Sequence, residues 1–187
     1  MLYRPVSLKD AAALAAIHGY YVERTAITFV CATPTEESFR EKIADIGSMY
    51  PFIVCEEAGK VLGFAYASAL RPHDAYRWDV ELSIYVEQGS HSHGVGTGLM
   101  ERLLRLLRRQ GFLNAYSCIT LPNPKSLALH KHFDFAEVGM FPRSGYKLGA
   151  WHDVIWLCLT LGSLEGEPKE PVPFAQLTDV EKARLLE

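Results

Sequence analysis

Apolar residues along this chain follow two spacings, and each spacing predicts a kind of element. Short runs that are apolar or alternate with polar residues are typical of strands, and apolar residues three or four apart are typical of helices. The pattern predicts strands at 2–4, 52–55, 61–68, 80–86, 115–121, 139–141 and 154–160. It predicts helices after the N-cap Ser7, at 36–46, at 97–109 and from Asn123-Pro124 to about His132.

The order of these elements favours a mixed α/β (α+β) fold. Early hairpins precede a single strand–helix–strand unit, and strands outnumber the helices available to cross between them. We therefore expect a mixed, mostly antiparallel central sheet with helices on both faces. The compact domain is expected to span residues 1–162, and the polar, proline-rich segment 163–187 to form a loosely attached C-terminal tail.

Composition limits the class of protein. The 187 residues are 49% hydrophobic with a formal net charge of -3, which predicts one domain with a sizeable core and no nucleic-acid partner. The apolar runs are too short to span a bilayer, and the N-terminus lacks a signal-peptide pattern, so no membrane partner is expected. The four separated cysteines (Cys31, Cys55, Cys118 and Cys158) indicate reduced thiols in a cytoplasmic protein.

Two histidine pairs, His91/His93 and His130/His132, raise the question of a metal site. Residues two apart do not share a helix face, and no cysteine or carboxylate set completes four ligands. We expect no metal.

A glycine cluster is the clearest functional pattern. The run Ile84-Tyr85-Val86 leads into residues 91–98, which contain Gly94, Gly96 and Gly98 and open an amphipathic helix. Glycines let a backbone approach an anion closely, and the first N–H groups of the helix point at it. The order predicts a site for a phosphate-bearing ligand. Without flanking motifs, such a segment would instead be an ordinary turn before a helix.

Four segments supply those flanking motifs: residues 76–81 (YRWDVE), 84–86 with the glycine loop, 123–135, and 145–153 (GYKLGAWHD). In this order and spacing they resemble the GCN5-related N-acetyltransferase (GNAT) superfamily, and within it the phosphinothricin and methionine sulfoximine acetyltransferase group. The resemblance covers roughly residues 2–161. It implies the GNAT fold with a splayed strand pair, acetyl-CoA as co-substrate and a homodimer.

The resemblance also implies which residues hold the coenzyme. His91 stands where the loop usually has glutamine or arginine, and the N–H groups from His93 to Gly98 are expected to bind the diphosphate. Pantetheine is expected to pair with the strand backbone, beside Asn123 and Ser126, which are also good helix caps. The expected coenzyme-binding set is Ile84, Tyr85, Val86, His91, His93, Gly94, Val95, Gly96, Thr97, Gly98, Asn123 and Ser126.

Acetyl transfer to an amine needs a base, because an ammonium group has a pKa well above neutral. Glu81 matches the family's general-base glutamate, and alternation places it on one face with Ser83 and Tyr85, where an apolar wall would raise its pKa. The position of Glu81 alone is equally consistent with a solvated carboxylate and with a catalytic base. A backbone N–H near Tyr85 or Val86 is expected to meet the oxyanion. His130, the second expected catalytic residue, either protonates or orients the leaving sulfur, or is a buried, hydrogen-bonded histidine.

An amino-acid-like acceptor needs a cation for its carboxylate, ideally an arginine. Arg71 matches an Arg-Pro pair of some members, and others carry arginine two positions later, where this chain has His73. Residues 147–153 resemble a family turn near the acceptor pocket and the dimer contact. The expected acceptor-binding set is Phe29, Arg71, His73, Tyr76 and Lys147, with Phe29 equally typical of a core.

Together these residues predict an acetyl-CoA-dependent N-acetyltransferase that acts on the amine of a small amino-acid-like molecule of the phosphinothricin, methionine sulfoximine or methionine sulfone type. Asp79 replaces a common threonine and Asp134 a common glycine, which puts phosphinothricin itself in question and not acetyl transfer. Two other interpretations stay open: a protein or peptide N-terminal acetyltransferase, and a non-catalytic acyl-CoA-binding regulator.

Overall fold

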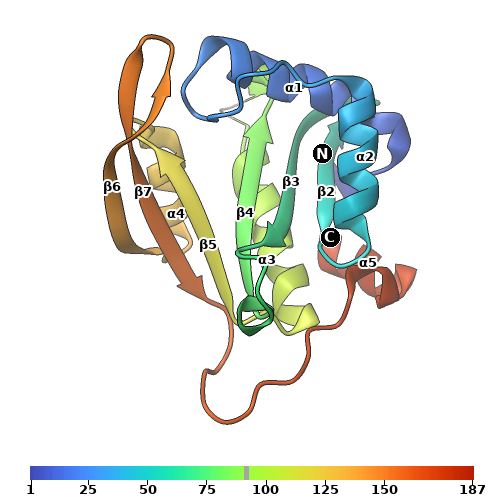
Figure 1. The fold of residues 1–187 in the computed structure, drawn as a ribbon. Helices are drawn as coiled ribbons and strands as arrows, with labels where there is room; N and C mark the ends of the chain where they lie inside the picture. The colour runs from blue at the N-terminus through green and yellow to red at the C-terminus, as the bar shows by residue number, and fades with distance from the viewer. Residues whose placement is uncertain (91–92) are drawn as a thin grey trace.

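The computed structural model describes residues 1–90 and 93–187. Seven strands form one sheet in the order β1-β2-β3-β4-β5-β7-β6 (Figure 1). The strands are β1 (Leu2–Pro5), β2 (Phe52–Glu57), β3 (Lys60–Ala69), β4 (Asp79–Val86), β5 (Asn114–Thr120), β6 (Ala136–Lys147) and β7 (Ala150–Thr160). The helices are α1 (Ala11–Arg24), α2 (Glu36–Gly47), α3 (Val95–Gln110), α4 (Pro124–His132) and α5 (Asp179–Leu186), with 3-10 turns η1 (Leu8–Asp10), η2 (Asp74–Tyr76), η3 (Gln88–Ser90) and η4 (Phe174–Gln176).

Neighbouring strands are antiparallel except β4 and β5, which run parallel. The β4–β5 pairing extends over Asp79–Glu81 and Asn114–Tyr116, after which the two strands diverge (Figure 1). On its other side β4 stays paired with β3 as far as Val86. The predicted mixed, mostly antiparallel sheet with a splayed strand pair is confirmed. The edge of β4 that faces β5 is open from Leu82 onward.

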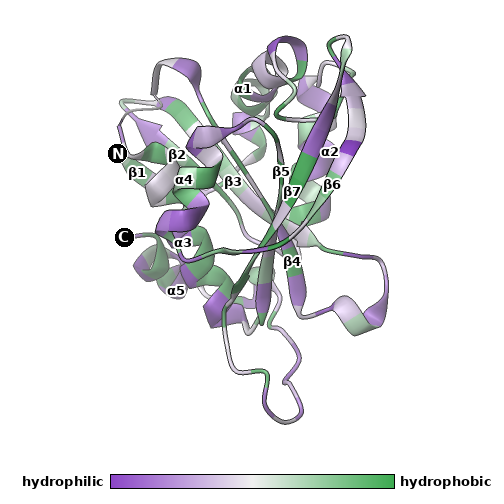
Figure 2. Ribbon diagram, turned by 90° about the vertical axis from the view of Figure 1, so that its left-hand side faces the viewer, coloured by the Kyte–Doolittle hydropathy of each residue, from purple (hydrophilic) through white to green (hydrophobic). Residues whose placement is uncertain are grey.

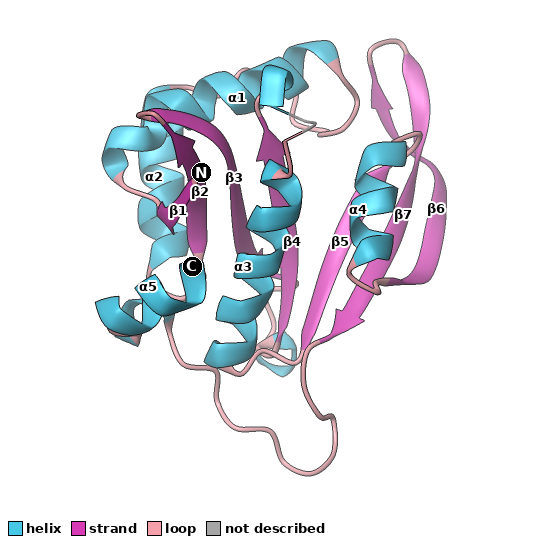
Figure 3. Ribbon diagram, turned by 180° about the vertical axis from the view of Figure 1, so that it is seen from behind, coloured by secondary structure: helices cyan, strands magenta, loops and turns pink. Residues whose placement is uncertain are grey.

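Helices cover both faces of the sheet. α1 and α2 lie on one face, and α3, α4 and α5 on the other (Figures 1 and 3). On α3, Leu99, Met100 and Leu103 are fully buried, whereas Arg105 faces solvent, and Figure 2 shows this mixture of hydrophobic and hydrophilic residues. The burial of one stripe fixes α3, and so its first turn, against the sheet. In the described part of the chain, no helix combines the length and the apolarity needed to cross a membrane.

Local sequence sets the ends of the helices. Thr35 caps α2 by accepting a backbone hydrogen bond from its first turn, and Gly111, at a φ of 89°, ends α3. Ser7 and Asp10 form the predicted capping box, but the residues that follow first make the 3-10 turn η1 before α1 begins.

The β6–β7 hairpin is longer than the predicted strands 139–141 and 154–160. Leu148 and Gly149 form its two-residue turn, with φ values of 50° and 79°. The register of β6 shifts between Glu137 and Gly139 and again between Phe141 and Gly145, which breaks the alternation that identifies a strand in sequence. Residues 147–153, predicted as a turn, are therefore the end of this hairpin.

The segment 163–187 is not loosely attached, contrary to the prediction. Phe174, Leu177 and Leu186 are buried in the same core as α3. The Gln110 side-chain amide donates hydrogen bonds of 2.8 Å to the carbonyls of Val172 and Met49. The polar, proline-rich composition correctly predicts an extended connection, but it conceals a few widely spaced apolar residues that bury enough surface to dock it.

Candidate active site

A cleft of about 900 Å³ opens where β4 and β5 diverge. Residues of α1 and the loop after it, of β4, of the start of α3, of β5 and of α4 line it. The structure brings most of the predicted site residues together there: Phe29, Glu81, Ile84, Tyr85, Val86, Gly94, Gly96, Thr97, Asn123, Ser126 and His130.

The open edge of β4 presents backbone groups to this cleft. The Glu87 N–H donates to the Leu62 carbonyl on the β3 side at 2.8 Å. Successive residues of a strand face opposite edges, so the N–H and C=O groups of Leu82, Ile84 and Val86 face β5. Since β5 has already diverged at this level, an extended ligand can pair with these groups as an added strand. The exception is the Val86 carbonyl, which accepts a hydrogen bond from the Tyr21 hydroxyl.

The start of α3 supplies a second set of donors. Gly94 caps the helix at a φ of 75°, and Gly96 and Thr97 line the cleft. The first N–H groups of a helix have no intrahelical acceptor and carry the positive end of its dipole, which suits a diphosphate. The predicted N–H contact of Gly98 is wrong, because that group donates to the Gly94 carbonyl at 2.9 Å.

The other residues of the loop have different outcomes. The Val95 side chain is fully buried in the core, and the contact of its backbone N–H stays a prediction. Gly98 is needed for packing: a Cβ there would lie 1.9 Å from the Tyr3 hydroxyl. His93 is exposed in the turn before α3 and is not part of the lining. The predicted contact of His91 lies outside the described residues.

Glu87, which the sequence analysis missed, organises the chain just before this loop. Its Oε2 accepts hydrogen bonds from the Gly89 N–H at 3.2 Å and the Ser90 hydroxyl at 2.9 Å. Its Oε1 lies 3.3 Å from the Lys60 ammonium. The hydrogen bond from Ser90, more than the Lys60 charge, holds the pKa of Glu87 below its usual range. The sequence signal that could have indicated this role is the position of Glu87, two residues before the Gly89-Ser90 pair.

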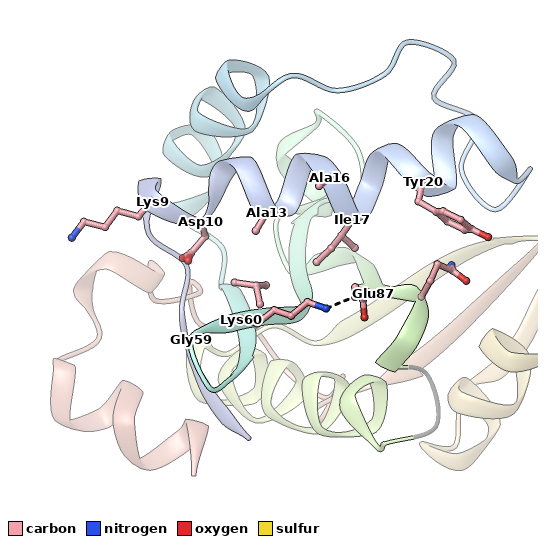
Figure 4. A pocket seen from close by; sticks show the side chains of 11 residues that line it. Lys9, Asp10, Ala13, Ala16, Ile17, Tyr20, Gly59, Lys60 and Glu87 are labelled. Carbon is pink, nitrogen blue, oxygen red and sulfur yellow. Dashed lines mark ion pairs between the residues drawn. The ribbon is translucent and has the colours of Figure 1, made fainter.

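This ion pair forms part of the wall of a second hollow of about 610 Å³ between α1 and the β2–β3 turn (Figure 4). Ala13, Ala16 and Ile17 supply its apolar side, and Tyr20 lines both this hollow and the main cleft. Glu87 therefore joins the β3 side of the sheet to the turn that leads into α3.

Glu81 lies half-buried in the main cleft, on the face of the sheet that carries α1 and α2. Burial raises the pKa of its carboxyl, and the positive charge of Arg71 opposes that shift. Arg71 lies over the Trp156 ring, 5.6 Å from its centre. Cys118 of β5 also lines the cleft, and burial, together with the Glu81 charge, raises the pKa of its thiol to about 11. The site thus combines the half-buried carboxylate of Glu81 with the guanidinium of Arg71, whose charge acts on it.

His130 is held in one tautomer by its two partners. Its Nδ1 lies 2.8 Å from the Ser126 carbonyl, which only accepts, so Nδ1 carries the proton. Its Nε2 then accepts from the Ser117 hydroxyl at 2.8 Å. Burial lowers the pKa of the ring, which favours its neutral form. The predicted role as an acid at the sulfur does not fit this arrangement.

Asn123 and Ser126 line the cleft and also cap α4. The Asn123 side-chain oxygen accepts a 3.2 Å hydrogen bond from the Ser126 N–H. This leaves the Asn123 amide N–H₂ group available to a ligand, while the Ser126 hydroxyl oxygen lies 3.4 Å from His130 Nδ1 and keeps its own O–H to donate. The capping and ligand-binding interpretations are therefore compatible here.

The acceptor-binding predictions divide into two groups. Phe29 lines the cleft, and Arg71 acts on Glu81 through its charge. His73 immediately precedes η2, and Tyr76 is its last residue. Both side chains are exposed, and neither lines the cleft. Lys147 is buried at 6% exposure, with its ammonium bound to the Thr28 carbonyl, and is absent from the lining as well.

Tyr21 is another residue that sequence reasoning missed. Its hydroxyl donates a 2.5 Å hydrogen bond to the Val86 carbonyl, and its ring packs edge-on against Tyr85 at 5.3 Å. The contact ties α1 to the open edge of β4. No local sequence pattern predicts this hydrogen bond, because the two bonded residues are 65 positions apart.

Comparison with known proteins agrees with this geometry. The sequence model of the acetyltransferase (GNAT) domain matches residues 4–156. The chain therefore belongs to the GNAT acetyltransferase family, and it is an acetyltransferase.

Within this family, the chain is similar to acetyltransferases named for phosphinothricin and for methionine sulfoximine and methionine sulfone. The chain is 34% identical to phosphinothricin N-acetyltransferase of Streptomyces viridochromogenes over 81% of its own length and 82% of the relative's. It is 31% identical to the L-methionine sulfoximine/L-methionine sulfone acetyltransferase of Salmonella typhimurium, over 86% and 95% of the two chains. A solved phosphinothricin acetyltransferase from Sinorhizobium meliloti, in complex with acetyl-CoA, superimposes with a TM-score of 0.87 at 31% identity, over 91% and 94% of the chains.

Proposed function

We propose that this protein transfers the acetyl group of acetyl-CoA to the amine of a small amino-acid-like molecule of the phosphinothricin, methionine sulfoximine or methionine sulfone type. The observation that carries the proposal is a single cleft that holds Glu81, the open edge of β4 and the first turn of α3. A base, a strand-like binding edge and an anion site are the parts that such a transfer requires.

Acetyl-CoA fits the donors that line this cleft. The N–H groups at the start of α3, with Gly94 as a cap that leaves room for phosphate, suit the diphosphate. The β4 edge suits the amides of the pantetheine arm, and Asn123 and Ser126 lie beside the same path. Acetyl-CoA is also bound in the Sinorhizobium meliloti neighbour.

Glu81 takes the proton from the acceptor's ammonium group. The raised pKa brings its basicity closer to that of the amine, and a base of this kind contributes about 10²- to 10⁴-fold. The freed nitrogen lone pair attacks the thioester carbon directly and forms the amide carbon–nitrogen bond. The carbon–sulfur bond breaks, and coenzyme A leaves as a thiolate that takes up the second proton lost by the nitrogen, directly or through water.

Negative charge develops on the thioester oxygen during that attack. The backbone N–H groups of Ile84 and Val86 face the cleft, and one preorganised donor of this kind contributes about 3 kcal/mol. The N–H of Tyr85 faces β3, so of the two donors considered from sequence only Val86 is suitable. His130 holds Ser117 and α4 in place.

The acceptor lies at the Glu81 end of the cleft. Thr28, Phe29 and Cys118 line this end, and the Arg71 guanidinium is the nearby cation for an α-carboxylate. We therefore assign amine binding to Glu81 and carboxylate binding to Arg71.

A thiol-release assay with DTNB tests the function. The panel holds phosphinothricin, methionine sulfoximine, methionine sulfone, proteinogenic amino acids, polyamines and peptides with free N-termini. We expect turnover of at least one of the first three compounds and loss of that turnover in Glu81→Gln, with the melting temperature retained. The matched control, Glu137→Gln, changes an exposed glutamate of β6 and keeps full activity.

Other results would contradict the proposal. Turnover of peptides alone would replace the acceptor class. Calorimetric acetyl-CoA binding without thiol release from any amine would make the protein a non-catalytic binder.

We further propose that the protein acts as a homodimer in the cytoplasm. Val138, Phe141 and Trp151 of the β6–β7 hairpin are 60%, 54% and 61% exposed along the edge of the sheet, a surface that a second copy would cover. Free thiols such as Cys31 and Cys118 suit a reducing compartment. Sedimentation that detects only monomers at working concentration would reject the dimer.

A further inference from the structure

We propose that Lys147 and Gly145, on the β6–β7 hairpin, are positioning residues that hold the loop after α1 and thereby set the shape of the acceptor end of the cleft. The inference rests on the proposed function, since the acceptor end is defined by Glu81. The loop, residues 25–35, contains no helix or strand and lies beside the end of the hairpin (Figures 1 and 3). It contributes Thr28 and Phe29 to the cleft wall.

The first contact is a buried ammonium. Lys147 is 6% exposed, and its Nζ donates a 2.6 Å hydrogen bond to the Thr28 carbonyl. Within the described residues, no carboxylate lies within ion-pair distance of it. Burial lowers the pKa of this lysine. A charged donor aimed at a single carbonyl fixes the position of that carbonyl more firmly than a neutral donor does.

Thr28 also lies next to β4 of the sheet. Burial raises the pKa of the Tyr85 phenol on β4, and the neighbouring Thr28 side chain opposes that shift. Tyr85 shares a face of that strand with Glu81. Lys147, Thr28 and the half-buried Tyr85 therefore link the hairpin to the strand that carries the proposed base.

The second contact depends on the absence of a side chain. A Cβ on Gly145 would lie 2.2 Å from two ring carbons of Phe29, so the ring rests directly on the glycine backbone. Even an added methyl group must push the ring away, because real Cβ atoms do not approach this closely. Phe29 is 38% exposed, so it has room to move when pushed.

Both contacts therefore act on neighbouring residues of one loop. Lys147 fixes the backbone at Thr28, and Gly145 fixes the ring at Phe29. Loosening either contact widens or reshapes the acceptor end, whereas the β4 edge and the start of α3 stay as they are. The acceptor KM should respond and acetyl-CoA binding should not.

The test uses the full-length chain with two pairs of variants. Lys147→Met removes the donor, and Lys131→Met is its control on an exposed lysine of α4. Gly145→Ala displaces Phe29, and Gly47→Ala, at the end of α2, is its control, because a Cβ there meets nothing within 4 Å. The acceptor probe is methionine sulfone or phosphinothricin, whichever the parent protein turns over.

We expect Lys147→Met to raise the acceptor KM about tenfold, the effect of losing one buried charged hydrogen bond. Gly145→Ala should also raise the acceptor KM, because it displaces the Phe29 ring, and the acetyl-CoA Kd from calorimetry should stay unchanged in both variants. Both controls should match the parent. Unchanged acceptor KM values in both test variants, or equal changes in acetyl-CoA binding, would overturn the inference.

A second readout does not depend on turnover. Hydrogen–deuterium exchange of a peptide covering residues 25–35 should speed up in Lys147→Met and Gly145→Ala and remain at the parent rate in the two controls. If the parent acetylates no amine, the proposed function fails, and exchange still decides whether the hairpin holds the loop. Unchanged exchange in all four variants would reject the proposal that the hairpin holds the loop.

Discussion

The Ser117 hydroxyl donates a 2.8 Å hydrogen bond to the Nε2 atom of His130, joining β5 to α4 in the wall of the cleft. The direction of this bond follows from the Ser126 carbonyl on the opposite side of the ring, which obliges Nδ1 to carry the proton. A histidine in this state is an acceptor toward the cleft. Its contribution is to hold β5 and α4 together.

This relationship predicts coupling between the two side chains. His130→Ala and Ser117→Ala should each destabilise the protein, and the double variant should cost about 1 kcal/mol less than the sum, because the second change finds the bond already lost. Urea unfolding of the four proteins measures this coupling. Strictly additive losses would show that the two groups do not interact.

The raised pKa of Glu81 predicts the pH dependence of the reaction. As a base, Glu81 works when deprotonated, so kcat/KM should rise with pH through a midpoint above the ordinary value of 4.5. Because the positive charge of Arg71 lowers this pKa, Arg71→Leu should move the rising limb to higher pH. Initial rates across the pH range give both midpoints. An unmoved limb in Arg71→Leu would separate Arg71 from the base.

The same shift predicts an effect on stability. A carboxyl whose pKa is higher when folded than when unfolded favours the folded state at low pH, and this contribution is lost as pH rises through the folded pKa. Glu81→Gln, which cannot ionise, should therefore unfold less readily than the parent at neutral pH, and the gain should shrink below the ordinary glutamate pKa. Chemical unfolding at two pH values checks the sign. A Glu81→Gln protein less stable at neutral pH would contradict it.

Glu87 should matter to the coenzyme and not to the acceptor. Glu87→Ala removes the acceptor of the Gly89 N–H and Ser90 hydroxyl bonds, and the loosened turn should weaken acetyl-CoA binding about fivefold, equivalent to about 1 kcal/mol. Lys60→Met removes only an exposed ion pair and should do less. Calorimetry measures both, with Glu57→Ala, an exposed neighbour on β2, as the control. A larger loss of acetyl-CoA affinity in Lys60→Met than in Glu87→Ala would contradict this prediction.

The docked C-terminal segment should contribute to stability. Phe174 is 6% exposed in the α3 core, so Phe174→Ala should cost about 3 kcal/mol through lost burial and the cavity it leaves. Leu164, 62% exposed in the same segment, is the control and should tolerate alanine. Urea midpoints compare the two. Equal, small losses would mean that the segment does not pack as described.

Features encoded within a few neighbouring residues were predictable. The apolar stripe of α3, the cap at Ser7 and the glycines at 94 and 96 follow from helix periodicity and backbone sterics, which any short stretch carries with it. Alternation along β4 likewise placed Glu81 on its proper face. The sheet and the glycine turn that opens α3 could therefore be predicted from the chain alone.

Other features depend on residues that meet only after folding. The Lys147 ammonium lies against the Thr28 carbonyl, 119 positions away, so what resembled a substrate contact is a structural one. The His130 tautomer needs Ser117 as well as Ser126, and the docking of Phe174 needs the packed flank of α3. Periodicity specifies which face of an element is apolar. It does not specify which distant polar group meets which partner, because that depends on the topology of the whole sheet.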